Sequence, residues 1–130
     1  MRIGVNALYL IPGAVGGTEI YLRSLLDALA RSDTENEYFV FTNRETGGGL
    51  SPKAKNFRTI EQRVRASSRS WRILWEQTAL PIEAVRLRLD IMLNAGFTAP
   101  LGCPCPQVTV FHDLQHKRHP EHFRWFDLPF

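Results

Sequence analysis

The sequence has few cysteines and no long apolar run, and both shortages restrict the class of protein. Its two cysteines, Cys103 and Cys105, lie two positions apart in the stretch CPCP. A disulfide across that spacing would be strained, and two thiols alone do not complete a zinc site, so we expect free thiols in a reducing compartment. No apolar run approaches the ~20 residues of a transmembrane helix. We therefore expect a cytoplasmic protein whose membrane contact, where it has one, is peripheral.

The sequence also lacks the two common phosphate-binding fingerprints, although it has a glycine-rich turn. This turn lies in GAVGGTEIYL, residues 13–22, directly after an apolar run. No lysine follows the glycines, which excludes an ATPase P-loop, and the spacing G-x-x-G-G differs from the dinucleotide fingerprint. Backbone amides at the start of a helix nevertheless suit a diphosphate. From the glycines alone two interpretations stay open: a phosphate-binding turn, or a tight turn that lets the helix dock on a sheet.

Basic residues are concentrated in the middle of the chain. The chain has 130 residues, 44% of them hydrophobic, which suffices for one globular domain with a core. The segment 44–88 contains ten basic residues (Arg44, Lys53, Lys55, Arg58, Arg63, Arg65, Arg69, Arg72, Arg86, Arg88) and four glutamates (Glu45, Glu61, Glu76, Glu83). It is either a solvated surface or a face for an anionic partner such as a phosphate or an acidic lipid surface. We expect no nucleic-acid partner, because no recognised binding motif is present.

Short apolar runs alternate with amphipathic segments, which predicts an α/β domain. Strands are expected at 3–10, 37–43, 57–64, 90–96 and 107–113. Helices are expected after the glycine turn and after the stretch ASSRS. This alternation predicts a Rossmann-like fold, with a mainly parallel sheet and flanking helices.

Each expected helix has an apolar face. The first face comprises Tyr21, Leu22, Leu25, Leu26 and Leu29, and the second comprises Trp71, Leu74, Trp75, Thr78, Ile82, Val85 and Leu89. We expect both faces to pack against the sheet. Gly17 or Thr18 should cap the first helix. Pro81 should kink the second helix or divide it in two.

Three segments follow strands of the expected sheet and are candidates for a binding site. They are the glycine turn after the first strand, NAGFT (94–98) after the fourth and HDL (112–114) after the fifth. Ligands of parallel sheets bind beyond the carboxyl ends of the strands, so these segments should share one edge.

Residues 2–30, RIGVNALYLIPGAVGGTEIYLRSLLDALA, resemble the amino-terminal segment of the retaining, nucleotide-sugar-dependent glycosyltransferases of the group 1 (family 4) type. WEQTALP at 75–81 and VTVFHDLQHKRHPEHF at 108–123 are similar to later stretches of that family. The resemblance implies a GT-B architecture, in which two Rossmann-like domains face each other across a cleft. Residues 1–130 would be the amino-terminal, acceptor-side domain, incomplete at its carboxy end.

The resemblance also implies an activity. It is the transfer of a hexosyl group from a nucleotide-diphosphate donor to a glycan or lipid-linked acceptor, with retained configuration and with no cofactor besides the donor substrate. Because the family holds the nucleotide in its second domain, we expect the fragment alone to be inactive. The alternative is a Rossmann-like module that binds a phosphorylated ligand without catalysis.

The resemblance assigns roles to individual residues. Gly16 and Gly17 match the glycine pair that approaches the donor phosphates, and His112 matches the histidine close to the transferred sugar, which makes it the catalytic candidate. Thr18 and Glu19 are supporting candidates, although an acidic residue at this place also suits the helix dipole.

Asp113 is a further supporting candidate, which would orient the loop or cap the next turn. A row of histidines in HDLQHKRHPEH invites a zinc site. Pro120 would break any helix that aligned them, so we expect no metal.

Overall fold

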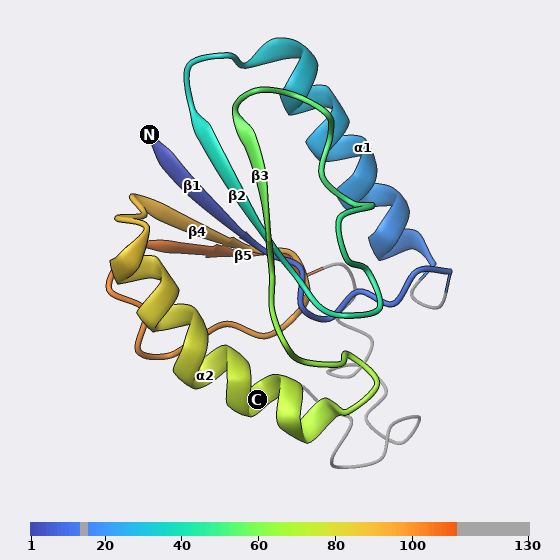
Figure 1. The fold of residues 1–130 in the computed structure, drawn as a ribbon, viewed down its shortest axis with the longest axis vertical. Coiled ribbons are helices and arrows are strands. Elements are labelled where there is room, and N and C mark those ends of the chain that lie inside the picture. The colour runs from blue at the N-terminus through green and yellow to red at the C-terminus, as the bar shows by residue number, and fades with distance from the viewer. Residues whose placement is uncertain (14–15, 112–130) are drawn as a thin grey trace.

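The computed structural model describes residues 1–13 and 16–111, which form a five-stranded sheet between two helices (Figure 1). The elements are β1 (Arg2–Asn6), α1 (Gly17–Ser32), β2 (Glu37–Thr42), β3 (Phe57–Glu61), α2 (Arg69–Arg86), β4 (Ile91–Asn94) and β5 (Gln107–Thr109). The strand order is β3-β2-β1-β4-β5, and every pair of neighbours is parallel. The predicted Rossmann-like α/β fold is confirmed.

The first strand is shorter than its apolar run predicts. β1 ends at Asn6, because the chain turns there: the amide of Leu10 donates to the Ala7 carbonyl at 3.2 Å, and the amide of Leu8 donates to Oδ1 of Asn6 at 3.3 Å. Leu8 and Leu10 are nevertheless fully buried. A continuous apolar run does not distinguish a buried strand from a buried turn, which is why the sequence overestimates the strand.

Two apolar layers lie on opposite faces of the sheet. Alternate strand residues point to opposite faces. On one side Val5 and Val40 pack with Leu22 and Leu26 of α1. On the other side the packed residues include Phe39, Phe41, Met92, Leu80 and Ala84, the last two from α2. The two helices therefore cover different faces, as Figure 1 shows.

The apolar face predicted for α1 is largely confirmed. Leu22 and Leu26 are fully buried, and Leu29 packs against the same cluster. Tyr21 is exposed, so it lies outside the buried face. The prediction that Gly17 or Thr18 caps this helix is wrong, because the helix begins at Gly17 and its N-cap residue is Gly16, which makes no side-chain capping bond.

The apolar face predicted for the second helix is wrong at five of its seven positions, and only Trp75 and Leu89 pack in the core. Trp71, Leu74, Ile82 and Val85 are 66%, 52%, 66% and 65% exposed. Thr78, in the middle of the predicted face, is exposed as well. The expected apolar side of the helix therefore points away from the sheet.

The side of α2 that packs on the sheet contains Glu76, Leu80 and Ala84, all buried. Trp75 is the one helix residue of the predicted face that packs against the core, and its indole nitrogen donates to Gln62 at 2.8 Å. Pro81 lies inside a single helix rather than between two.

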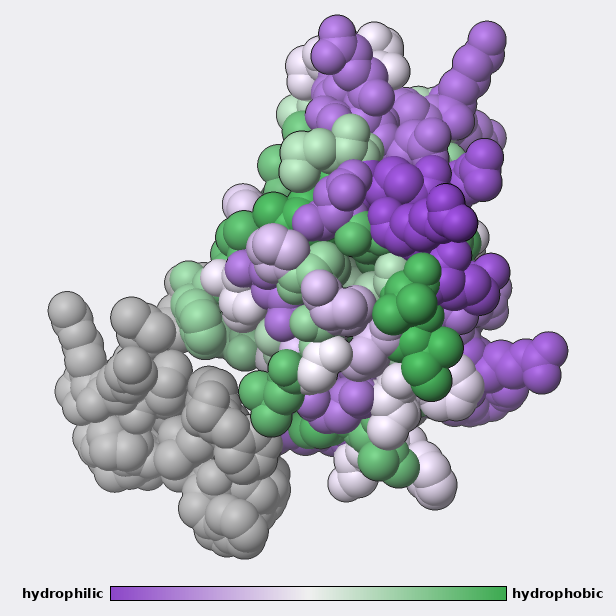
Figure 2. All heavy atoms as spheres, turned by 90° about the vertical axis from the view of Figure 1, so that its left-hand side faces the viewer, coloured by the Kyte–Doolittle hydropathy of each residue, from purple (hydrophilic) through white to green (hydrophobic). Residues whose placement is uncertain are grey.

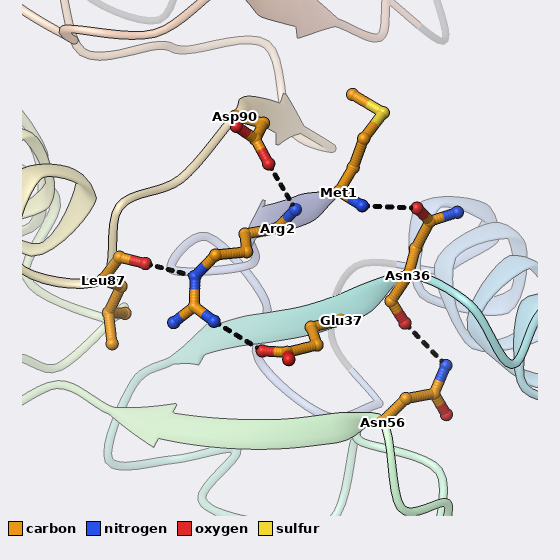
Figure 3. A network of polar contacts seen from close by, with 7 residues as sticks. All are labelled: Met1, Arg2, Asn36, Glu37, Asn56, Leu87 and Asp90. Atoms are coloured by element: carbon orange, nitrogen blue, oxygen red, sulfur yellow. Dashed lines mark hydrogen bonds and ion pairs between the residues drawn. The ribbon is translucent and has the colours of Figure 1, made fainter.

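Polar contacts tie together the edge where the strands begin (Figure 3). Arg2 donates to Oε2 of Glu37 at 2.7 Å and, through Nε, to the Leu87 carbonyl at 2.6 Å. Its own backbone amide donates to Asp90 at 2.7 Å, and the amino group of Met1 donates to Asn36. These contacts fix β1 to β2 and to the end of α2.

Candidate functional site

The strand order reverses between β1 and β4, and this switch point is where parallel sheets bind ligands. From β1 the chain builds outward to β2 and β3, then crosses through α2 to β4 on the other side. At the carboxyl edge, Asn6 ends β1 and Asn94 ends β4, and the two are register partners. A ligand bound at the switch point would therefore lie next to these two asparagines.

A buried polar network lies directly under the switch point. Nδ2 of Asn6 donates to Oε2 of Glu76 at 2.9 Å and to Oδ1 of Asn94 at 3.0 Å. The Thr98 hydroxyl donates to the same Glu76 oxygen at 3.0 Å. The network thus joins β1, α2, β4 and the segment after β4.

Glu76 is the ionisable member of this network, and its surroundings favour its neutral form. Burial raises the pKa of the Glu76 carboxyl, against hydrogen bonds from Asn6 and Thr98 and the charge of Arg72 that act in the opposite direction. Its Oε1 is buried and makes no hydrogen bond within the described part of the chain, and the same holds for Nε of Arg72. The sequence prediction includes Thr98 and Asn94 in NAGFT but misses Asn6 and Glu76. The available signals were a polar asparagine in the middle of the apolar run 3–10 and a glutamate directly after Trp75 in the expected second helix.

The segment after β4 lies against the segment after β1. A Cβ placed on Gly96 would lie 2.5 Å from the ring of Tyr9, so a glycine is required for the two segments to pack. The amide of Ala95 also donates to the Asn6 carbonyl. The structure therefore packs NAGFT against the residues between β1 and the glycine turn.

The glycine turn contains two glycines that the backbone requires, Gly13 with a φ of 79° and Gly16, and one that it does not, Gly17. Gly16 has a φ of 58°, which favours glycine, whereas Gly17 is the first residue of α1 and has no positive φ. A Cβ at either position would meet no atom of the described residues within 4 Å. Conformation explains Gly16, but neither conformation nor packing explains Gly17.

The Glu19 carboxylate joins the two ends of the glycine turn by hydrogen bonds, which is a structural role. Its Oε2 accepts the Gly13 amide at 2.8 Å, and its Oε1 accepts Nε of Arg23 at 2.9 Å. Arg23 also donates to the Gly49 carbonyl. The Gly13 amide, followed by Arg23, lowers the pKa of the Glu19 carboxyl. Thr18 lies in the first turn of α1 and is not its N-cap.

His112 and Asp113 lie outside the described residues. The chain before them reaches the carboxyl edge of the sheet: the amide of Val110 donates to the Asn94 carbonyl at 2.9 Å. The ring of Phe111 lies 6.0 Å from that of Phe97, centre to centre. The last described residues, Val110 and Phe111, therefore lie near the switch point. The roles of His112 and Asp113 stay predictions.

The two thiols are free and lie 3.4 Å apart. Burial raises the pKa of the Cys105 thiol to about 12, and the neighbouring Cys103 adds to this rise, so the reactive thiolate is disfavoured.

Within residues 1–13 and 16–111, no three side chains of the usual ligand types gather as a metal site. In the same ranges, neither helix combines the length and apolar character needed to cross a bilayer.

Comparison with family models, with curated proteins and with solved structures gave no match. The fold is therefore assigned from the order and pairing of the strands alone.

Proposed function

We propose that this chain is the acceptor-side, amino-terminal part of a retaining glycosyltransferase, which moves a hexosyl group from a nucleotide-diphosphate donor to a glycan or lipid-linked acceptor at the cytoplasmic side of the cell. One observation carries the proposal: the glycine turn leads from the end of β1 into α1 at the switch point of an all-parallel sheet. The sequence resemblance supplies the reaction class. We also propose that a second Rossmann-like domain, as in the GT-B architecture, faces this one across a cleft and holds the nucleotide.

The amino end of α1 is suited to hold a diphosphate. The amides of Glu19 and Ile20 donate to the Gly16 carbonyl and close the first turn of α1, and the N-cap residue Gly16 makes no side-chain capping bond. A diphosphate would therefore approach the backbone at Gly16 and Gly17. Amides at this end of a helix point outward, and the helix dipole adds a partial positive charge. As the bond between sugar and phosphate breaks, negative charge grows on the leaving diphosphate, so donors fixed there stabilise the transition state.

The open space at Gly17 supports this role. A glycine at the first position of a helix weakens the helix, and here neither φ nor packing demands it. A ligand that approaches the backbone closely gives a reason for its presence. The network around Asn6 and Glu76 is buried, so in this proposal it holds the two loops in place and does not touch the sugar.

A titration of the ¹⁵N-labelled chain tests the proposal. We expect nucleotide-diphosphate sugars and inorganic pyrophosphate to shift the same amides, in 13–19 and 94–98, with weak affinity because the turn offers few contacts. The corresponding nucleoside without phosphate is the control and should leave these amides unchanged. A hollow at the opposite edge of the sheet is lined by residues 34–39 and by Lys55, Asn56 and Arg58. Shifts confined to these residues would overturn the assignment of the site.

A transfer assay separates the enzyme from the alternative, a module that binds a phosphorylated ligand. With radiolabelled donors, the 130-residue chain should not transfer sugar, whereas an enzyme carrying both domains should, with retention of configuration. Binding without any transfer by the two-domain protein would favour the non-catalytic module. Rapid turnover by the 130-residue chain would contradict the assignment of donor binding to a second domain.

A further inference from the structure

The outward face of α2 carries a row of large apolar side chains. Trp71, Leu74, Ile82 and Val85 are each at least half exposed, and the exposed Thr78 completes the row. At 3.6 residues per turn these five positions fall within an arc of about 80° and along about 21 Å of the helix. Single exposed apolar residues are ordinary, but a contiguous row of this kind indicates an interaction surface. We call this row the outward face of α2.

The outward face lies opposite the side that packs on the sheet. Glu76, Leu80 and Ala84 are the buried residues of α2, and their centre lies about 160° around the helix from the centre of the row. An element of the same layer would contact the flanks of α2. Covering the row itself requires something stacked on top of the helix, so packing within the helix layer does not account for it.

Exposed arginines lie before and after the helix that carries the outward face. Residues 63–88 contain six arginines and two glutamates. One of the glutamates, Glu76, is buried, and the other, Glu83, pairs with Arg86. Arg63 and Arg65 are exposed before the helix, and Arg88 is exposed after it. Figure 2, which looks onto the side where α2 ends, shows hydrophobic side chains at the surface beside strongly hydrophilic ones.

We propose that the outward face of α2 docks onto an anionic phospholipid bilayer. The row would enter the boundary between headgroups and acyl chains, with the arginines at both ends among the headgroups. An apolar face with a tryptophan and basic flanks is the pattern of a helix that lies in the plane of the membrane interface. Anionic lipid supplies the complementary charge. The proposal goes beyond the transferase function and does not depend on it.

A matched pair of substitutions tests this docking. Ile82 on the outward face of α2 and Ile20 on α1 are 66% and 69% exposed, on opposite sides of the sheet. We expect the chain to float with vesicles of phosphatidylglycerol and phosphatidylcholine, and to do so less at high salt. Ile82→Glu should weaken this binding on the order of tenfold, because it loses a buried apolar side chain and adds a negative charge. Ile20→Glu should change it by less than about twofold, since it adds the same charge on the far side.

The outcomes distinguish a membrane from other partners of the outward face of α2. Thermal melts first establish that both variants fold, and Val85→Glu replaces Ile82→Glu if the latter does not. Equal binding to pure phosphatidylcholine vesicles, or equal losses for the two isoleucine variants, would overturn the proposal. Absent vesicle binding would overturn it too, and in that case self-association that Ile82→Glu abolishes would identify the face as a contact between copies of the chain. No readout uses a nucleotide sugar, so failure here leaves the transferase proposal standing.

Discussion

The side-chain amide of Asn6 donates to Glu76 at 2.9 Å, although the two residues are 70 positions apart in the chain. This bond joins the end of β1 to the middle of α2. A buried carboxyl group needs hydrogen-bond partners, and Asn6 and Thr98 supply them only when Glu76 points toward the sheet. The bond therefore helps to fix the rotation of α2, and with that rotation the apolar row of the helix faces outward.

The pH dependence of folding should change when Glu76 is replaced by glutamine. Burial raises the pKa of this carboxyl in the folded chain. Above the unfolded value of about 4.3, the unfolded chain loses its proton first, so the contribution of Glu76 to stability is complete below that pH and falls as pH rises toward the folded pKa. Glu76→Gln removes this fall, so the variant should gain melting temperature relative to wild type between about pH 4 and neutrality.

The matched control for this prediction is Glu83→Gln on the same helix, where the carboxylate pairs with Arg86. This variant retains Glu76, so it should retain the loss of stability that Glu76 causes as pH rises. A constant difference between wild type and Glu76→Gln at every pH would contradict a raised pKa at Glu76.

Two glycines of the turn should respond differently to alanine. Gly16→Ala places a side chain at a φ of 58°, so it should destabilise the chain by about 1–3 kcal/mol. Gly17→Ala meets open space at a helical position and should stabilise it by about 0.5–1 kcal/mol, while weakening the amide shifts caused by pyrophosphate. Urea unfolding and the NMR titration measure the two effects. Undiminished pyrophosphate binding by Gly17→Ala would argue for a purely structural turn.

The orientation of α2 predicts that two leucines of this helix differ strongly in how much stability is lost when each is replaced by alanine. Leu80 is fully buried, so Leu80→Ala should cost about 2–5 kcal/mol of unfolding free energy. Leu74 is half exposed, and Leu74→Ala should stay within about 0.5 kcal/mol of wild type. Equilibrium denaturation in urea compares them. A larger loss for Leu74→Ala would mean that the outward face packs against the protein itself.

Arg88 ends α2 in a conformation that glycine prefers. Its φ is 53°, and the Leu89 amide behind it donates to the Ala84 carbonyl at 3.0 Å, as in a Schellman motif. Arg88→Gly should therefore raise the free energy of unfolding by about 1 kcal/mol. Arg86→Gly, inside the helix, is the control and should lower it by a similar amount. The prediction fails if both glycines destabilise the chain.

His112 should act in catalysis rather than in folding. In an enzyme carrying both domains, His112→Ala should lower kcat on the order of 10²-fold if the imidazole contacts the reacting sugar, with little change in melting temperature. Steady-state kinetics and thermal melts of the same variant separate the two effects. Full activity, or loss of activity only through unfolding, would remove His112 from the site.

The sequence by itself determined the fold class and the edge of the sheet that carries the candidate site. Short apolar runs alternating with amphipathic segments predicted a parallel α/β domain, because each strand must be covered on both faces. NAGFT begins at the last residue of β4, and the glycine turn lies between the end of β1 and the start of α1, so both lie at the carboxyl edge as the sequence predicts. These are local patterns, which a single stretch of chain contains in full.

Only the tertiary structure decided the end of β1, the rotation of α2 and the members of the polar network. The apolar row from Trp71 to Val85 was predicted to pack against the sheet, yet it faces outward. Periodicity shows that a helix has two sides, but which side is buried depends on partners distant in sequence. Here the partner of Glu76 is Asn6, and only the folded sheet brings the two together.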